Sequence, residues 1–496
     1  MINTLIQKII AKRLPQIEHF MLKPHEVQAE VFHYLTEQAQ DTVWGKFYDY
    51  ASIKNWETFD KRVPVNDYDT LLPFFNRIRS GENNVLWSSQ IKWFSKSSGT
   101  TSTKSKFIPV SEESLIDCHY KGGKDMLALY CYNYPENNLF EGKSLALGGS
   151  KQENDLNENI FCGDVSAILI DNLPLWAELY RVPKKEIALM SEWEEKLKLM
   201  VQSVVTSNVV SLSGVPSWLM VLLKNILEYT GKKTISEVWQ NLEVYFHGGV
   251  SFEPYKTQYD YIVGKQINYM ETYNASEGFF GLQNSKNDNS LLLLLDYGIY
   301  YEFIAIDDPT ETVINLEQVE TGKNYAMLIS TNAGLWRYKI GDTITFTQTV
   351  PYRFKITGRT KHYINACGEE LIVDNATKAL DAACKKTNAI INEYTAAPLF
   401  TDTYSHQWLI EFEKEPEDFI LFVDTLDKTL QQINSDYEAK RYKDLVLKRP
   451  TVQSVPQNTF YLWLKSKNKL GGQHKVPRLC NTRQYLDEIF EIIKTP

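Results

Sequence analysis

The chain has 496 residues with 53 basic and 62 acidic side chains, which give a formal net charge of −9. This charge argues against nucleic-acid binding through a basic surface as the main function. With 43% apolar and 13% aromatic residues it is too rich in core-forming side chains for a disordered protein, and its length predicts two to four structural units. The longest aliphatic run, Leu291–Leu295, is far shorter than the roughly 20 residues of a membrane helix. No signal peptide or disulfide framework is indicated, so we expect a cytoplasmic protein that binds no membrane.

The first half of the chain predicts helices and buried strands in alternation. Apolar side chains recur at helical spacing before Pro15 and again after Pro24, which predicts two helices within the first 40 residues. Val204–Leu212 suits a buried strand, and apolar residues over 218–226 then form a helical stripe. Leu242–Phe246 is another short strand. Strands that alternate with helices at such spacings predict an α/β architecture.

The second half changes pattern at about residue 359. Before that point the predicted strands are Leu291–Leu295, Tyr300–Ile306, Tyr325–Ser330 and Ile344–Thr347. After it we expect helices over 375–386 and 417–441, and strands over Trp408–Phe412 and Thr459–Leu464. The change predicts a large domain of residues 1–358 and a smaller α+β domain of residues 359–496.

A hydroxyl-rich stretch with several lysines runs from Ser95 to Lys106 around Gly99, between two predicted strand ends. Such a turn can offer backbone N–H groups, hydroxyls and ammonium groups to a polyphosphate. It is not a Walker A loop, because the Gly-Lys-Ser/Thr ending is absent. A solvated polar hairpin is the alternative interpretation of this composition.

Three further motifs carry side chains that suit a nucleotide site. Tyr273 and Glu277 lie four residues apart, so a ring can face a base while a carboxylate lies near a phosphate-bound metal ion. Asp342 follows a glycine at a predicted strand end, where it can accept both hydroxyls of a ribose. Residues 465–484 hold four lysines, two arginines and no acidic residue. Taken singly, these motifs also fit ordinary turns and a solvated loop.

In this order, the motifs resemble those of the acyl acid–amido synthetases of the plant auxin-responsive type, the Gretchen Hagen family. The family's phosphate loop matches residues 97–106, its Tyr-x-x-Ser-Glu motif matches Tyr273–Glu277, and its Tyr-Arg-x-Gly-Asp motif matches Tyr338–Asp342. Its late Gln-x-Lys-x-Pro-Arg motif matches Gln473–Arg478, and Val63–Val65 with Tyr68 is a supporting match. The resemblance extends from about residue 42 to residue 478.

The sequence departs from the family pattern in two motifs. Ser102 and Thr103 stand where the family usually has glycines, so the phosphate loop is expected to be stiffer. Lys339 replaces the usual Arg, which keeps the charge but loses the planar fork of donors. Neither departure removes a residue to which the resemblance gives an indispensable role.

The resemblance places the chain in the adenylate-forming superfamily, which includes acyl-CoA ligases and firefly luciferase. It implies a large multi-layer N-terminal α/β domain with sheets flanked by helices, and a small C-terminal domain that rotates about a hinge at Gly358–Arg359. It also implies a ligase that uses ATP and Mg²⁺ to convert a carboxylic acid into an acyl-adenylate, which an amine, typically of an amino acid, then attacks. The expected partners are these small molecules, and the expected state is a monomer.

Two other functions remain open, an acyl-CoA synthetase and a nucleotide-binding protein that has lost catalysis. For the leading function the resemblance assigns Lys475 as the mobile catalytic cation, Glu277 to catalysis and Mg²⁺, Asp342 to the ribose and Tyr273 to a flank of the adenine. The other nucleotide-binding residues that it implies are Ser97, Ser98, Thr100, Thr101, Gly249, Val250, Ser251, Ser276 and Arg359. The candidates for the acyl pocket are the large aromatic residues Tyr130, Tyr132, Trp176 and Trp218.

Overall fold

The structure is a computed structural model. It describes residues 2–97, 106–149, 151–152, 160–249, 252–359, 363–364, 369, 371–400, 404–441, 447–470 and 475–494. Two compact units divide the chain. The larger unit contains Met1–Gly249 and Lys265–Lys355, and the second unit contains Val250–Gly264 and Ile356–Pro496. The second unit therefore includes a segment that lies far upstream of the predicted boundary after residue 358.

Among the described residues, twelve strands form one mixed sheet. Their order is β13 (Val313–Asn315), β12 (Ile299–Ala305), β14 (Asn324–Thr331), β15 (Tyr338–Thr349), β16 (Tyr352–Arg359), β11 (Leu291–Leu293), β10 (Gly278–Leu282), β9 (Asn268–Ala275), β8 (Val244–Gly248), β7 (Val209–Gly214), β3 (Lys143–Ala146) and β6 (Arg181–Val182). The strands from β9 to β6 run parallel, and those from β9 to β11 are antiparallel. Parallel neighbours need crossovers, and helices supply them here, whereas short turns join antiparallel neighbours. The sheet therefore confirms the predicted α/β class.

A second sheet carries the hydroxyl-rich stretch. Its order is β2 (Lys106–Val110), β1 (Trp93–Ser97), β5 (Phe161–Gly163) and β4 (Lys151–Gln152). Strands β1 and β2 are antiparallel, with Ser97 opposite Lys106 at the end where the connecting segment joins them. The stretch thus leaves β1 and returns in β2, and its middle, residues 98–105, lies outside the described residues.

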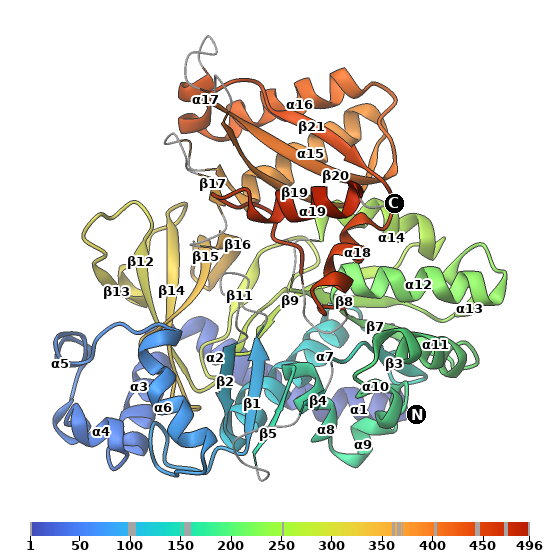
Figure 1. Ribbon diagram of the computed structural model, residues 1–496. Helices are drawn as coiled ribbons and strands as arrows, with labels where there is room; N and C mark the ends of the chain where they lie inside the picture. Colours follow the sequence, from blue (N-terminus) through green and yellow to red (C-terminus); the bar gives the residue numbers. More distant parts are fainter. Residues whose placement is uncertain are drawn as a thin grey trace. The chain divides into compact units, whose positions relative to one another are not determined.

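Helices of the large unit flank these sheets (Figure 1). They are α1 (Ile2–Ile10), η1 (Ala11–Arg13), α2 (Leu14–Leu22), α3 (Pro24–Ala39), α4 (Val43–Phe47), η2 (Tyr50–Ser52), α5 (Trp56–Arg62), α6 (Tyr68–Arg79), η3 (Ser114–Tyr120), α7 (Lys121–Asn133), α8 (Val165–Asp171), α9 (Leu175–Glu178), α10 (Lys185–Ala188), α11 (Trp193–Val204), α12 (Pro216–Thr230), α13 (Ile235–Val238) and η4 (Leu316–Gln318). Helix α12 begins at a proline and ends before Gly231, whose φ of 66° suits a helix C-terminus. No helix in the described part of the chain has the length and apolar character that crossing a membrane requires.

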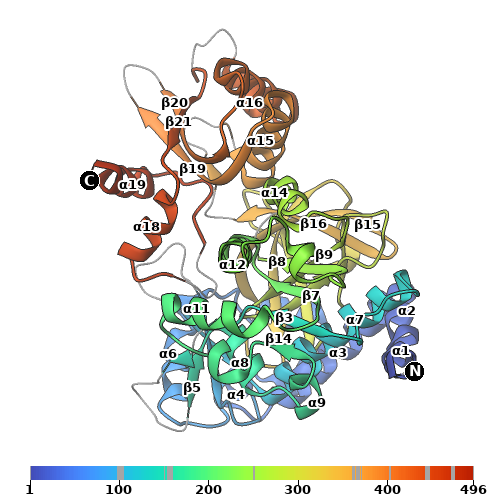
Figure 2. The same cartoon turned by 90° about the vertical axis from the view of Figure 1, so that its right-hand side faces the viewer.

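The second unit is built on the strands β19 (Ile390–Phe400), β20 (Tyr404–Lys414) and β21 (Thr451–Val455). Helices α15 (Val373–Thr387) and α16 (Phe419–Ile433) pack over one face of this sheet (Figure 2), with Leu380, Trp408 and Phe422 in the shared core. Its other described elements are α14 (Glu253–Val263), β17 (Tyr363–Ile364), β18 (Leu371–Ile372), α17 (Ser435–Arg441), α18 (Thr459–Ser466) and α19 (Gln484–Lys494).

Three sequence predictions are wrong in detail. The predicted strand over Thr459–Leu464 is helix α18, in which Phe460, Trp463 and Leu464 are buried at helical spacing. The predicted helix over 417–441 is two helices, α16 and α17, because the chain adopts an extended conformation at Asn434. Val204 ends helix α11, and strand β7 begins only at Val209.

Candidate active site

Two buried hydrogen bonds in the large unit link β9 and the turn after it to β15 and to β1. The Tyr273 hydroxyl, on β9, donates a hydrogen bond of 2.5 Å to Oδ2 of Asp342, on β15. Ser95, on β1, donates to Oγ of Ser276 at 2.9 Å. All four side chains are buried. Because Ser276 follows Tyr273 by three residues, the strand that leads into the hydroxyl-rich stretch lies beside the segment that contacts Asp342.

The ring of Tyr273 is 6% exposed and packs against Phe280 and Phe354, with ring centroids 5.0 and 6.1 Å away. Packing of this kind fixes the ring, so its hydroxyl holds the carboxylate of Asp342 in one orientation. The sequence suggested a ring beside a base; the structure adds a hydrogen-bonded partner that the motif alone did not reveal.

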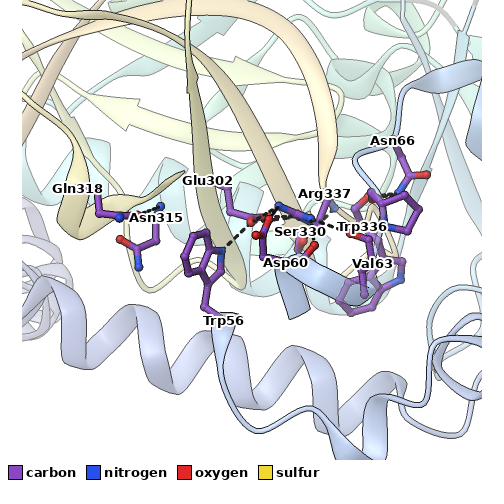
Figure 3. A network of polar contacts seen from close by, with 11 residues as sticks. Trp56, Asp60, Val63, Asn66, Glu302, Asn315, Gln318, Ser330, Trp336 and Arg337 are labelled. Atoms are coloured by element: carbon purple, nitrogen blue, oxygen red, sulfur yellow. Dashed lines mark hydrogen bonds and ion pairs between the residues drawn. The ribbon is translucent and has the colours of Figure 1, made fainter. Parts of the chain in front are cut away.

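A buried arginine fixes the start of the strand that carries Asp342 (Figure 3). Arg337 is 2% exposed, and its Nε donates to Glu302 at 3.0 Å while Nη2 donates to Asp60 at 2.6 Å. Its Nη1 donates to the carbonyl of Val63 at 2.7 Å, and the indole of Trp56 donates to Glu302 at 2.8 Å. Burial raises the pKa of Glu302, and the positive charge of Arg337 opposes that rise. Every part of this guanidinium therefore has a partner.

Asn66 is hydrogen-bonded to the chain on both sides of Arg337. The N–H of Asn66 donates to the carbonyl of Arg337 at 2.9 Å, and the N–H of Lys339 donates to the carbonyl of Asn66 at 2.8 Å. The Asn66 side chain also donates to the carbonyl of Trp336 at 2.8 Å. These bonds hold residues 336–339 in place, three residues before Asp342.

The start of β2, at the loop end of the β1–β2 hairpin, is held by helix α6. The hydroxyl of Tyr68 accepts a hydrogen bond of 3.0 Å from the N–H of Phe107, and Nζ of Lys106 lies 5.5 Å from the centre of the Tyr68 ring. The guanidinium of Arg79 lies 4.2 Å from the centre of the Phe107 ring. The hydroxyl-rich stretch therefore returns to a fixed point on α6.

Comparison with known proteins identifies the family. The GH3 family N-terminal domain matches residues 13–267, the central domain matches residues 292–359, and the C-terminal domain matches residues 374–484. The chain belongs to the GH3 family. The family resemblance of the motifs is thereby confirmed.

GH3 relatives match over nearly the whole chain. Indole-3-acetic acid-amido synthetase GH3.3 of Arabidopsis thaliana is 23% identical, over 94% of this chain and 91% of the relative. The 4-substituted benzoates-glutamate ligase GH3.12 of Arabidopsis thaliana is also 23% identical, over 87% and 88%. The predicted enzyme class, an amide-forming ligase, is the class in which these relatives are named.

Solved structures confirm the GH3 and adenylate-forming fold. The acyl acid amido synthetase GH3.15, in complex with 2,4-DB, superposes with a TM-score of 0.81 at 17% identity, covering 99% of this chain and 96% of that chain. A 2-hydroxyisobutyryl-CoA ligase in the postadenylation state, in complex with 2-HIB-AMP, gives a TM-score of 0.59 at 14% identity, covering 99% and 92%.

The other residues that the GH3 motifs assign lie at the ends of strands, in connecting segments or outside the described residues. Gly249 follows β8, Glu277 lies in the turn between β9 and β10, and Arg359 is the last residue of β16. Ser97 ends β1, whereas Ser98, Thr100, Thr101, Val250 and Ser251 lie outside the described residues. Lys475 lies in the second unit, in the segment between α18 and α19.

The four acyl-pocket candidates have separate surroundings. Tyr130 is buried and its hydroxyl accepts a hydrogen bond of 3.0 Å from Asn268. Trp218 is buried and packs edge-on against Trp193, with ring centroids 4.9 Å apart. Tyr132 is 68% exposed, and the side chain of Trp176 lies outside the described residues. Tyr130 and Trp218 thus belong to the packed interior.

The Arg337–Glu302 pair is a feature that sequence reasoning missed. Glu302 is the one carboxylate in β12, a strand in which every residue is buried. Because an isolated carboxylate is rarely buried without a partner, this position itself indicated a buried cation. Lys339, by contrast, pairs with Glu311 at 2.6 Å on the surface.

Proposed function

We propose that this GH3 family member is an ATP-dependent ligase that activates a carboxylic acid as an acyl-adenylate and joins it to an amine. The observation that carries the proposal is the contact of Tyr273 with Asp342 beside the contact of Ser95 with Ser276. These contacts link the segment from Tyr273 to Ser276 to the strands of two other motifs, which supports a nucleotide site formed by all three. The name of the relative GH3.12, a glutamate ligase, supports an amino acid as the amine.

In the first half-reaction, an oxygen of the substrate carboxylate bonds to the α-phosphorus of ATP and the bond to pyrophosphate breaks. This step brings negative charges together, so donors and cations must already be in place around the phosphates. We assign Ser97, Ser98, Thr100 and Thr101 to the β- and γ-phosphates. Asp342, oriented by Tyr273, accepts the hydroxyls of the ribose.

Lys475 supplies the positive charge on the α-phosphate and the acyl oxygen. A lysine suits this role, since its ammonium group is a compact point charge that can approach one crowded oxygen. In the second half-reaction, the nitrogen of the amine bonds to the acyl carbon, AMP leaves with the electron pair of the broken bond, and the amine loses a proton. We assign the change between the half-reactions to a rotation of the second unit about Gly358 and Arg359.

The chain offers a suitable ligand for Mg²⁺. Among the described residues, no group of three or more His, Cys, Asp or Glu side chains could hold a metal ion by itself. Mg²⁺ on a nucleotide typically needs only one or two carboxylates, because phosphate oxygens and water complete its shell. Glu277, one residue after the buried Ser276, fits that requirement. The bound ion would neutralise phosphate charge.

We also propose that the protein is a monomer and is located in the cytoplasm.

An ATP–pyrophosphate exchange assay across a panel of carboxylic acids tests the proposal. At least one acid should support exchange, and amino acids should then release AMP as an amide forms. Release of AMP with CoA in place of amino acids would instead identify an acyl-CoA synthetase, whose fold this chain shares. The absence of exchange with every acid would contradict the proposal.

Two matched variants test the assigned cation. Lys475→Ala should lower the rate of adenylation by about 100-fold or more while leaving ATP binding nearly unchanged. Lys465→Ala removes a lysine from the same basic segment, at an exposed position of α18, and should keep the rate within about twofold. A wild-type rate of pyrophosphate release in Lys475→Ala would refute the role of Lys475.

A further inference from the structure

The chain that follows Lys475 is fastened along strand β19 of the same unit. The N–H of Ala396 donates to the carbonyl of Arg478 at 2.9 Å, and the N–H of Cys480 donates to the carbonyl of Ala396 at 3.1 Å. The hydroxyl of Thr395 donates to the carbonyl of Pro477 at 2.6 Å. The main chain from residue 477 to residue 480 therefore has a fixed register against β19.

The side chain of Arg478 makes a second set of contacts at this point. Its guanidinium forms an ion pair with Glu393 and donates to the hydroxyl of Tyr255 at 2.7 Å. It also donates to the carbonyl of Tyr394 at 3.2 Å and lies 4.6 Å from the centre of the Tyr394 ring. The side chains of Arg478 and Glu393 are only 13% and 12% exposed. One planar group thus holds three different partners at once, which a lysine cannot do.

Lys475 lies three residues before this arginine. Three residues span at most about 10 Å, so the position of Lys475 is confined by whatever fixes residue 478. Val476, between them, is 5% exposed, which leaves the lysine little freedom on its C-terminal side. Through Tyr255 the same guanidinium also contacts α14, the helix that follows the predicted nucleotide segment 249–251.

We propose that Arg478 is a positioning residue for adenylation: it orients the segment that presents Lys475 to the reacting phosphate. The inference rests on the proposed function, in which Lys475 is the catalytic cation. The contacts of Arg478 described above are with Glu393, Tyr255 and Tyr394, so its proposed effect on the reaction is exerted through Lys475. Glu393 and Tyr255 complete the cluster, since each holds the guanidinium through an ion pair or a hydrogen bond.

The test uses the full-length protein and single-turnover release of pyrophosphate. Arg478→Gln should lower the rate of adenylation by about tenfold, with the KM for ATP within about threefold of the wild type. Arg478→Lys should not restore the rate, because the fork of donors is lost. Tyr255→Phe, the mildest change, should lower the rate by about twofold to fivefold.

Arg483→Gln is the matched control. Arg483 also ties the tail to this sheet, by donating to the carbonyl of Pro398 at 3.1 Å and to Gln407 at 2.9 Å, but it lies eight residues from Lys475. Its loss should lower the melting temperature without changing the rate of adenylation. Equal losses of rate in Arg478→Gln and Arg483→Gln would overturn the proposal, as they would show a general structural effect.

A double variant separates positioning from stability. If Arg478 acts through Lys475, Lys475→Ala with Arg478→Gln should be no slower than Lys475→Ala alone. Additive losses would overturn the proposal, and so would a wild-type rate in Arg478→Gln. A wild-type protein that adenylates no acid would refute the proposed function itself, which is a different result from an active wild type with an unaffected Arg478 variant.

Discussion

Two arginines, one in each unit, lie close in sequence to a residue with a proposed role, and their surroundings differ. Arg337 is 2% exposed, faces two carboxylates and has a φ of 44°, which is unfavourable for a residue other than glycine. Arg478 faces one carboxylate, and its side chain remains 13% exposed. The first is enclosed by two carboxylates and backbone carbonyls, whereas the second stays in contact with solvent and joins the segment after Lys475 to β19 and α14.

This difference separates two kinds of support for a site. A strained, fully enclosed residue persists only where its surroundings determine it strongly, so the effect of removing it should appear in the free energy of unfolding. A partly solvated anchor contributes less to folding, so the effect of removing it should appear in a rate. The following predictions test this division, starting with the largest effect.

Arg337→Met should destabilise the large unit by about 3 to 5 kcal/mol, because Glu302 is left buried without its counter-charge. Denaturant unfolding measures this loss. The double variant Arg337→Met with Glu302→Gln should recover part of it, since the uncompensated charge is gone. A cost below about 1 kcal/mol for the single variant would show that the pair is not part of the framework.

Acid should weaken the large unit through two buried histidines. Burial lowers the pKa of His119 to about 4 and that of His247 to about 3. Below pH 6.5 the unfolded chain therefore binds protons that the folded chain does not, and stability falls as the pH falls. From pH 6.5 to 5 the loss of stability is about 1.6 kcal/mol for each histidine.

Unfolding curves at several pH values measure how steeply the free energy of unfolding depends on pH. His247→Gln should reduce this slope. An unchanged slope in that variant would contradict a neutral, buried His247. Arg478→Gln should leave the slope as it is in the wild type, because both histidines belong to the large unit.

Tyr273→Phe should lower the free energy of unfolding by about 1 to 2 kcal/mol, because the buried carboxylate of Asp342 loses a donor. It should also raise the KM for ATP. Tyr301→Phe is the control: it removes a buried hydroxyl that donates to the carbonyl of Leu294 at 3.1 Å in the same unit. Calorimetric titration with ATP should separate the two variants. Equal ATP affinities would show that the Tyr273–Asp342 contact is structural only.

Lys339→Ala should have the smallest effect, although Lys339 lies only two residues from Arg337. Its ion pair with Glu311 is largely exposed, and such pairs contribute about 0.2 to 1 kcal/mol. Adenylation rates of Lys339→Ala and Lys339→Arg should match the wild type. A large loss in either variant would restore a role for the motif's usual arginine.

Local patterns in the sequence predicted many of the elements. The spacing over 375–386 predicted α15, and the stripe from Trp218 to Ile226 predicted α12, because both helices bury one apolar face. The strand predicted over Thr459–Leu464 was wrong, since six apolar-rich residues do not distinguish a strand from a helix. The motifs grouped Tyr273 with Asp342, but spacing alone could not show that one holds the other.

The partners of Arg337 and Arg478 could not be predicted from local sequence patterns, for a different reason. Arg337 lies 35 residues from Glu302 and 277 from Asp60, and Arg478 lies 223 from Tyr255. An arginine in a short motif looks the same whether it is solvated or enclosed. Only the order of the strands brings its partners to it.

The second unit is not one continuous stretch of sequence, because α14 is inserted between β8 and β9 of the large unit. A gene fragment that starts at Ile356 would therefore encode β19 and its tail without the helix that supplies Tyr255. Such a fragment should be a poor module for recombination between paralogues. Exchanging it would combine Arg478 of one paralogue with Tyr255 of the other. Substitutions at Tyr255 and at Arg478 should consequently occur together.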